Sequence, residues 1–354
     1  MDRPDIPSTE GLASSASGNG HSEVDSSRTD KDGNLLEKLC CGSAVNSDED
    51  LSRAVDASNN NDFPEVTPRD KDYYDLSPRE GKKIALVFNH KTFDPVIRPE
   101  LKDRDGTEND VKEIKEVFKK QLGFEVSVHN DKPVSEIRRI MAEISNLGEI
   151  SCLVIFILTH GDDGRPYAYD CDYSIENVIL DQLMPTSAIN LLGKPKIVFL
   201  ASCQGKMTDS GHWVRSRNSS GNVDPKSTQV DAIPIPPKKP AEIFCIPNQC
   251  DILIYQASYP GHFSFRNTVH GTWLIQTLCQ TLKESGENDE IYDVLVKTSR
   301  RVAFDRSSSK VIIEGQEYEK LKQLPVLKST LVRYVYLKRD WSKFDHAQIP
   351  DIIQ

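Results

Sequence analysis

The chain has 354 residues, of which 37% are hydrophobic and 28% are charged, and its formal net charge at pH 7 is −10. This negative balance leaves no domain-wide basic face to neutralise phosphates, which excludes nucleic acid as the main partner. The sequence shows no secretory signal and no apolar run near the roughly 20 residues of a membrane span, so we expect a cytoplasmic protein without membrane contact. Its eight cysteines are scattered along the chain, which favours reduced thiols over a disulfide framework.

The first part of the chain differs in composition from the rest. Residues 1–75 are rich in Ser, Asn, Asp and Gly, and Phe63 is the one aromatic residue among the first 72. A segment of this kind cannot bury enough apolar surface to offset its chain entropy. We therefore expect a disordered N-terminal segment over residues 1–75.

From residue 82 onward, apolar runs that predict buried strands alternate with segments of helical periodicity. The predicted strands cover residues 82–89, 124–128, 152–158, 196–201, 251–257 and 329–337. The predicted helices cover residues 107–121, 135–147, 272–283 and 290–303, with further helical turns near 175–190. Thr107 and Asp110 resemble a capping box for the first helix, and Gly123 resembles its C-cap. This alternation favours an α/β fold with a mainly parallel sheet and helices on both faces.

Residues 207–243 interrupt the alternation. They are polar and then rich in proline, and they show no periodicity. This composition is typical of an exposed, flexible linker. The folded part is therefore expected as two regions, 76–206 and 244–338, with residues 339–354 extending past the last predicted strand.

A histidine and a cysteine directly follow two of the predicted strands, at His160 and Cys203. The carboxyl ends of parallel strands meet at one edge of a sheet, where sites form. An imidazole beside a thiol can take its proton and return one to a leaving amine. The N–H groups of Gly161 and Cys203 could stabilise the oxyanion that forms on the attacked carbonyl. The residues alone leave open the alternative of a buried structural cysteine and a hydrogen-bonded core histidine.

Neither a metal nor another cofactor is expected. Cys245 and Cys250 have a spacing outside the common zinc pattern, and no second pair of ligands follows them.

Four stretches of the sequence resemble motifs of the caspase family, and they occur in consistent order between residues 82 and 337. They are Thr159-His160-Gly161, Ala201-Ser202-Cys203-Gln204-Gly205, Arg104-Asp105-Gly106-Thr107, and Ser264-Phe265-Arg266-Asn267 followed by Gly271-Thr272-Trp273.

The resemblance implies a caspase-like three-layer fold and a cysteine endopeptidase that cleaves protein substrates after aspartate. It makes Cys203 the nucleophile and His160 the general acid and base, and it assigns the oxyanion site to the N–H groups of Gly161 and Cys203. Arg104 and Arg266 match the two arginines that bind the substrate aspartate, a role that suits the guanidinium fork. The other matched substrate-binding positions are Phe263, Ser264, Phe265, Asn267 and Trp273.

The sequence departs from the family pattern next to the cysteine. Ala201 stands where the family has a glutamine that lines the aspartate pocket, and Ser202 stands where it has an alanine. Loss of one charged hydrogen bond would cost about 1.5–3 kcal/mol of substrate binding. We therefore expect a weakened or relaxed preference for aspartate.

The resemblance also implies a zymogen of the short-prodomain effector type, with a role in apoptosis, that an upstream protease activates by cutting the linker. Asp231 is the preferred processing site there, and Asp25 and Asp56 are candidates in the N-terminal segment. The family's active form implies a homodimer of large-plus-small units.

Two other functions fit parts of the same pattern. Ala201 favours a catalytically weak caspase homologue that acts as a decoy or as a regulatory dimer partner. A relative that cleaves after basic residues, of the metacaspase type, is disfavoured by Arg104 and Arg266, because such an enzyme needs acidic groups in its first pocket.

Overall fold

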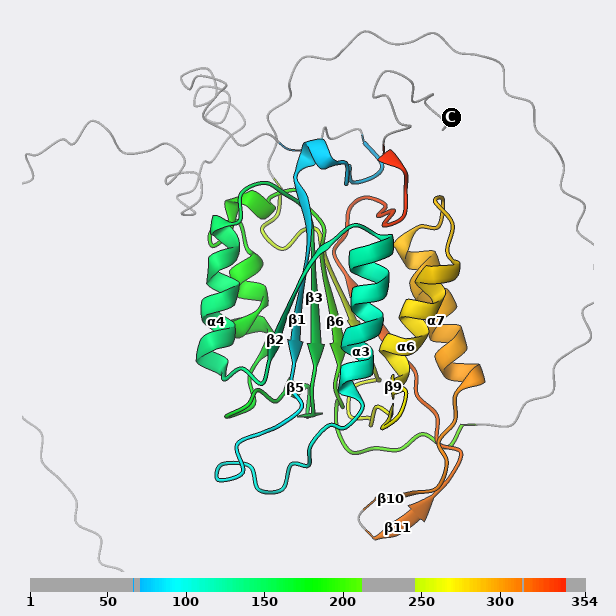
Figure 1. The fold of residues 1–354 in the computed structure, drawn as a ribbon. Coiled ribbons are helices and arrows are strands. Elements are labelled where there is room, and N and C mark those ends of the chain that lie inside the picture. The colour runs from blue at the N-terminus through cyan, green and yellow to red at the C-terminus, as the bar shows by residue number, and fades with distance from the viewer. Residues whose placement is uncertain (1–65, 67–70, 212–245, 314, 342–354) are drawn as a thin grey trace, which may run out of the picture. The chain divides into compact units, whose positions relative to one another are not determined.

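The computed structural model describes residues 66, 71–211, 246–313 and 315–341 (Figure 1). The predicted processing sites Asp25, Asp56 and Asp231 lie outside these residues, as does most of the predicted linker. Among the helices that the structure describes, none has the length and apolar character needed to cross a membrane.

The core of the fold is a sheet of six strands in the order β12-β7-β6-β3-β1-β2. All neighbouring strands in it are parallel except the edge strand β12, which runs antiparallel to β7. The strands are β1 (Lys82–Asn89), β2 (Glu125–Asn130), β3 (Ile150–Leu158), β6 (Lys196–Ala201), β7 (Ile252–Gln256) and β12 (Val326–Ser329).

Helices cover both faces of this sheet (Figure 1). One face packs against α3 (Thr107–Ile114) with its π-helical continuation Lys115–Gln121, α6 (Trp273–Glu284) and α7 (Ile291–Asp305). The other face packs against α4 (Val134–Ala142), α5 (Ile175–Val178) and the short 3-10 turns Glu143–Asn146, Leu180–Leu183 and Ile189–Leu191. The structure thus confirms the predicted three-layer α/β architecture.

The apolar runs of the central strands follow from this double covering. Along β1, Ala85 and Val87 enter the core on the α3 side, whereas Ile84, Leu86 and Phe88 enter the core on the α4 side. Every residue of β3 is buried. A strand buried on both faces has no polar alternation, which explains why these strands read as continuous apolar runs.

Three small hairpins were not predicted, because strands of two or three residues carry no usable periodicity. They pair β4 (Gly161–Asp162) with β5 (Arg165–Pro166), β8 (Arg266–Asn267) with β9 (Gly271–Thr272), and β10 (Val311–Ile313) with β11 (Gln316–Tyr318). The first two carry residues that the sequence had marked as site candidates.

The prediction of a strand over residues 329–337 is wrong. Strand β12 ends at Ser329, and the chain beyond it leaves the sheet. Val335 and Leu337 are buried, so the alternation correctly marked inward-facing residues. However, the backbone N–H of Val335 donates to the Glu290 carboxylate, and its carbonyl accepts from Ile291. The alternation here reflects packing of an irregular segment on the start of α7.

Two further expectations need correction. The predicted capping box does not form: the Thr107 hydroxyl donates to Asn89, and Asp110 accepts hydrogen bonds from a distant segment described below. The folded part also begins before residue 76, because Tyr74 is buried in the core and donates to Asp251. At the other boundary, Met207 of the predicted linker still pairs with His262 in a β-bridge.

Candidate active site

The register of the sheet places His160 and Cys203 at corresponding positions. Leu158 and Ala201 are paired residues at the ends of β3 and β6, and His160 and Cys203 each follow two residues later. Gly161 approaches the same point, because a Cβ atom added to it would lie 2.7 Å from the carbonyl oxygen of Cys203. The backbones that follow the two strands are therefore in direct contact, as a shared site requires.

The environment of His160 sets which ring nitrogen carries the proton. Nε2 lies 2.8 Å from the carbonyl oxygen of Lys102, and because a carbonyl only accepts, Nε2 is the donor. In the neutral ring, Nδ1 is then free to accept a proton. The pKa of His160 is lowered to about 4, mainly by burial and also by the charges of Arg104 and Arg266, while the Lys102 carbonyl opposes the decrease. The ring also packs against Phe93, with centroids 5.2 Å apart.

The Cys203 thiol is half-buried and contacts one residue of the segment that carries Arg266. Its Sγ accepts from the backbone N–H of Ser264 at 3.4 Å, and it lies 3.6 Å from both the carbonyl and the hydroxyl oxygen of that serine. Directly after the cysteine, the N–H of Gln204 donates to the carbonyl of His262 at 2.9 Å. Gly205 comes so close to Gly261 that a Cβ atom would not fit there.

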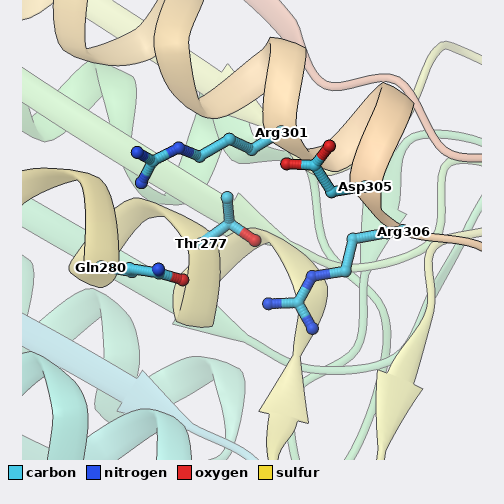
Figure 2. Close-up of a pocket in the computed structure, with 5 residues that line it drawn as sticks. All are labelled: Thr277, Gln280, Arg301, Asp305 and Arg306. Carbon is cyan, nitrogen blue, oxygen red and sulfur yellow. The ribbon is translucent and has the colours of Figure 1, made fainter.

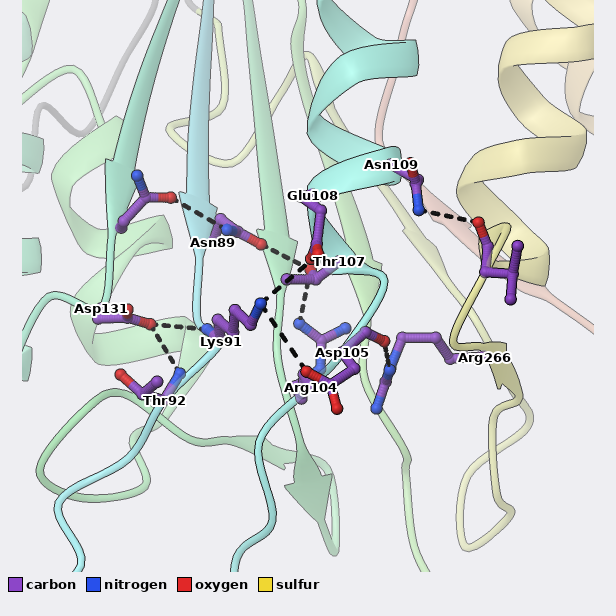
Figure 3. A network of polar contacts seen from close by, with 12 residues as sticks. Asn89, Lys91, Thr92, Arg104, Asp105, Thr107, Glu108, Asn109, Asp131 and Arg266 are labelled. Atoms are coloured by element: carbon purple, nitrogen blue, oxygen red, sulfur yellow. Dashed lines mark hydrogen bonds and ion pairs between the residues drawn. The ribbon is translucent and has the colours of Figure 1, made fainter.

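Arg104 is 2% exposed, and among the described residues its side chain donates hydrogen bonds only to uncharged groups (Figure 3). Its Nη1 donates to the carbonyl of His90 at 2.9 Å and to the Thr107 hydroxyl at 3.0 Å, and Thr107 in turn donates to Asn89 at 2.6 Å. Burial lowers the pKa of Arg104 to about 10, and the charge of Arg266 adds to the decrease.

Arg266 lies on β8, half-buried, and donates to the carbonyl of Asp105 (Figure 3). Burial lowers its pKa as well. The Cys203 sulfur acts electrostatically on both Arg104 and Arg266, so the three groups lie near one another. Within the described part of the chain, neither arginine forms an ion pair. This arrangement can accept an anion beside the thiol.

The aromatic candidates form the wall next to Arg266. Phe265 and Trp273 pack with their ring centroids 4.8 Å apart, and the backbone N–H of Trp273 donates to the Phe265 carbonyl. The N–H of Phe263 donates to the carbonyl of Met207. Asn267 has a different place, because its Oδ1 accepts from two backbone N–H groups within the β8–β9 turn.

Ala201 brings no polar atom to the arginines. It is 2% exposed and belongs to the apolar core on the α3 side. The Gln204 amide does not substitute for the missing glutamine, because its contacts are with Ser202, the Cys203 carbonyl and Gln256.

Sequence reasoning missed one residue that supports the site, Gln323. Its side chain is buried and bridges two segments: Oε1 accepts from the Phe265 N–H at 2.7 Å, and Nε2 donates to the Ala257 carbonyl at 2.8 Å. No local pattern around Gln323 indicates this role, since its partners are more than fifty residues away in the sequence.

A cavity of about 390 Å³ lies elsewhere, between α6 and α7, lined by Thr277, Gln280, Arg301, Asp305 and Arg306 (Figure 2). It contains none of the predicted site residues and is not a candidate for the substrate pocket. Among the described residues there is no cluster of three or more His, Cys, Asp or Glu that could hold a metal ion.

Comparison with known proteins gives a consistent picture. A family model described as the caspase domain matches residues 82–336. Caspase-1 of Drosophila melanogaster is 33% identical over 73% of this chain and 74% of its own length, and caspase drICE of the same organism is 33% identical over 76% and 73%. The crystal structure of caspase-1 from Spodoptera frugiperda superposes with a TM-score of 0.65 at 28% identity, covering 79% of this chain and 99% of that one.

The fold and these relatives define a cysteine-type endopeptidase. More specifically, the chain belongs to the caspase family.

Proposed function

We propose that this caspase-family chain hydrolyses protein substrates after aspartate, with Cys203 as the nucleophile. The observation that supports this most strongly is the pair of desolvated arginines beside the thiol, neither of which has a counter-ion within the described residues. A guanidinium fork binds a carboxylate with two parallel hydrogen bonds. A substrate carboxylate would therefore supply the negative charge that Arg104 and Arg266 lack.

The proposed reaction begins with proton transfer from the Cys203 thiol to Nδ1 of His160. The thiolate attacks the carbonyl carbon of the scissile bond, and the N–H groups of Gly161 and Cys203 donate to the resulting oxyanion. His160 then gives its proton to the leaving amine. Water, activated by the same imidazole, hydrolyses the thioester and regenerates the thiol.

The Lys102 carbonyl would orient the imidazole throughout this cycle. It accepts from Nε2 and so keeps the basic nitrogen of His160 on the opposite side of the ring. In a triad this third group is often a carboxylate, which also stabilises the charged imidazolium. A neutral carbonyl stabilises it less, which fits a ring whose pKa is low.

Selectivity for aspartate would rest on Arg104 and Arg266, with Phe263, Ser264, Phe265, Asn267 and Trp273 as the remaining substrate-binding positions. Because Ala201 offers no amide at this point, glutamate should be tolerated better than in a pocket that has the glutamine.

Regulation would follow the pattern implied by family membership. We propose a zymogen that an upstream protease cuts at Asp231, with Asp25 and Asp56 as further processing sites, and an active homodimer of large-plus-small units. Family membership also supports a role in apoptosis.

The test is hydrolysis of fluorogenic peptides ending in Asp, Glu or Arg by the purified chain, both intact and after cleavage at position 231. We expect turnover of the Asp peptide that falls by at least about 10⁴-fold in Cys203→Ala, as for removal of other catalytic nucleophiles. Turnover that survives in Cys203→Ala would refute the assignment. No turnover in any form would instead favour a regulatory dimer partner, the function that Ala201 makes the second candidate.

A further inference from the structure

A buried carboxylate joins the start of α3 to the hairpin that carries Arg266. Asp110 is fully buried in the first turn of α3. Its Oδ1 accepts from the backbone N–H of Thr272 at 2.9 Å and from the Gln276 side-chain amide at 3.0 Å, and its Oδ2 lies 3.1 Å from the same Thr272 nitrogen. Thr272 belongs to β9, the strand that pairs with Arg266 in β8.

The first turn of α3 and the residue before it approach this hairpin closely at several points. A Cβ atom on Gly271 would lie 2.3 Å from Oδ1 of Asp110, and one on Gly106 would lie 2.4 Å from the Thr268 carbonyl oxygen. Both glycines have positive φ, so a side chain would be strained as well as crowded there. Asn109 adds a hydrogen bond to the Val269 carbonyl at 2.9 Å (Figure 3). The position of the hairpin is therefore fixed by its contacts with the start of α3.

The negative charge of Asp110 also acts on the two arginines of the site. Its carboxylate raises the pKa of both Arg104 and Arg266, which means that it stabilises both cations. The two guanidinium groups repel each other, since the charge of Arg266 lowers the pKa of Arg104. The groups that face Asp110 are these two arginines, the Thr272 N–H, the Gln276 amide and the Cys279 thiol of α6.

We propose that Asp110 is a positioning residue that holds the β8–β9 hairpin, and with it Arg266, where the guanidinium can bind the substrate carboxylate. This inference rests on the proposed function and deepens it, because it assigns part of the aspartate selectivity to a residue that does not touch substrate. Asp110 acts through its hydrogen bonds from Thr272 of the hairpin and from Gln276 of α6, and through a charge that offsets the repulsion between Arg104 and Arg266.

Burial raises the pKa of Asp110 to about 6, despite the opposing effect of its hydrogen bonds and of Arg104. Because this lies above the ordinary value of 3.8, protonated Asp110 contributes stability below pH 3.8 that is lost as the pH rises through about 6. At neutral pH the ionised carboxylate therefore costs stability. A side chain retained at such a cost is expected to act through its charge.

The decisive variant is Asp110→Asn, which keeps the shape and an accepting oxygen for Thr272 and Gln276 but removes the charge. We expect KM for the Asp peptide to rise about tenfold, the effect of about 1.4 kcal/mol, with kcat within about twofold of the wild type and an unchanged or higher unfolding temperature. The matched control is Glu116→Gln, which removes one exposed negative charge further along the same helix and should leave KM unchanged.

The dependence of KM on pH separates a positioning role of Asp110 from a merely structural one. For the wild type, KM should rise as the pH falls through about 6, where Asp110 loses its charge. In Asp110→Asn, KM should be high at every pH, without the rise that the wild type shows below about pH 6. A KM equal to that of the wild type, or a loss confined to kcat, would overturn the proposal.

A readout that needs no turnover keeps this test independent of the proposed function. Hydrogen exchange of peptides covering residues 264–273 should be faster in Asp110→Ala than in the wild type, and unchanged in Glu116→Gln. If the wild type proves inactive, the proposed function fails, while faster exchange in Asp110→Ala still supports the role of Asp110 in holding the hairpin. Exchange that does not change in Asp110→Ala would refute that role whatever the activity.

Discussion

At the carboxyl end of the parallel strands, Arg104 and Arg266 are desolvated and have no ion pair within the described residues, whereas at the amino end Lys196 is buried together with a counter-ion. The Lys196 Nζ lies 3.9 Å from the Asp251 carboxylate, and the two side chains are 4% and 2% exposed. The Tyr74 hydroxyl donates to the same carboxylate at 2.6 Å.

The Lys196 ammonium is bound within the chain on several sides. It donates to the carbonyl oxygens of Leu191 and Lys194 and forms an ion pair with Asp251. Burial lowers its pKa to about 8, and Asp251 opposes that decrease. Burial alone therefore does not mark a functional charge. A buried cation with an internal counter-ion supports the fold, and one without it is available to a ligand.

The largest effect should come from breaking the group of Lys196, Asp251 and Tyr74 at the amino end of the sheet, here called the closed cluster. Asp251→Asn leaves Lys196 buried without its counter-ion, which typically costs about 3–5 kcal/mol of folding free energy. Urea unfolding should show this loss, while KM of the protein that remains folded should stay within about twofold of the wild type.

The control for this variant is Glu125→Gln at the same end of the sheet. It breaks the exposed ion pair between Glu125 and Lys82, so the loss should be at most about 1 kcal/mol. Equal losses in the two variants would contradict the distinction between a closed cluster and a surface pair.

At the carboxyl end, Arg104→Lys should impair substrate binding more than stability. Lysine keeps the charge but cannot form two parallel hydrogen bonds with a carboxylate, and the loss of one charged bond is worth about 1.5–3 kcal/mol. We therefore expect kcat/KM for the Asp peptide to fall by about 10–150-fold. Arg138→Lys on α4, an exposed arginine that donates to the Asn177 carbonyl, should change neither activity nor stability. An Arg104→Lys enzyme with normal kcat/KM would remove this arginine from the pocket.

Ala201→Gln should sharpen the selectivity of the same pocket. The added amide can donate one hydrogen bond to the substrate carboxylate, and geometry that suits aspartate should not suit the longer glutamate. We expect the ratio of kcat/KM for Asp over Glu peptides to rise about tenfold, which corresponds to about 1.4 kcal/mol. Ala201→Leu serves as the control for filling the space without an amide. A rise in both variants, or in neither, would contradict an effect of the amide.

The smallest effect concerns the fall of kcat at low pH, the acid limb of its pH profile, where His160 becomes protonated. Since burial holds the pKa of His160 at about 4, the base stays neutral, and kcat should persist from pH 7 to about 5 before it falls through about 4. Phe93→Ala exposes the ring and should move this limb toward the ordinary value of 6.5. Phe304→Ala, at an exposed phenylalanine of α7, should leave it in place. A wild-type limb already near pH 6.5 would contradict the burial argument.

The parts of the fold that the sequence predicted are those with local periodicity. The buried strands are long apolar runs, and each central helix has one apolar face, so their order and type could be predicted from their own residues. The positions of His160 and Cys203 followed from the rule that parallel strands end at one edge.

The parts that could not be predicted depend on contacts between distant segments. Asp110 resembled a helix cap because Thr107 precedes it by three residues, yet its partner Thr272 is 162 residues away. The alternation after Ser329 suggested a strand, but the hydrogen bonds of Val335 go to the start of α7. In both cases the local pattern was real, and a tertiary partner determined its meaning.

In the proposed mechanism Cys203 is the nucleophilic thiol, and Arg104 and Arg266 direct an aspartate to it. The most direct test is labelling with a peptide that ends in aspartate and carries an electrophilic ketone, followed by mass-spectrometric mapping of the modified residue. We expect one label per chain, on Cys203, that is strongly reduced in Arg104→Lys and absent when the peptide ends in arginine. Labelling of the exposed Cys171 instead, or equal labelling by both peptides, would contradict it.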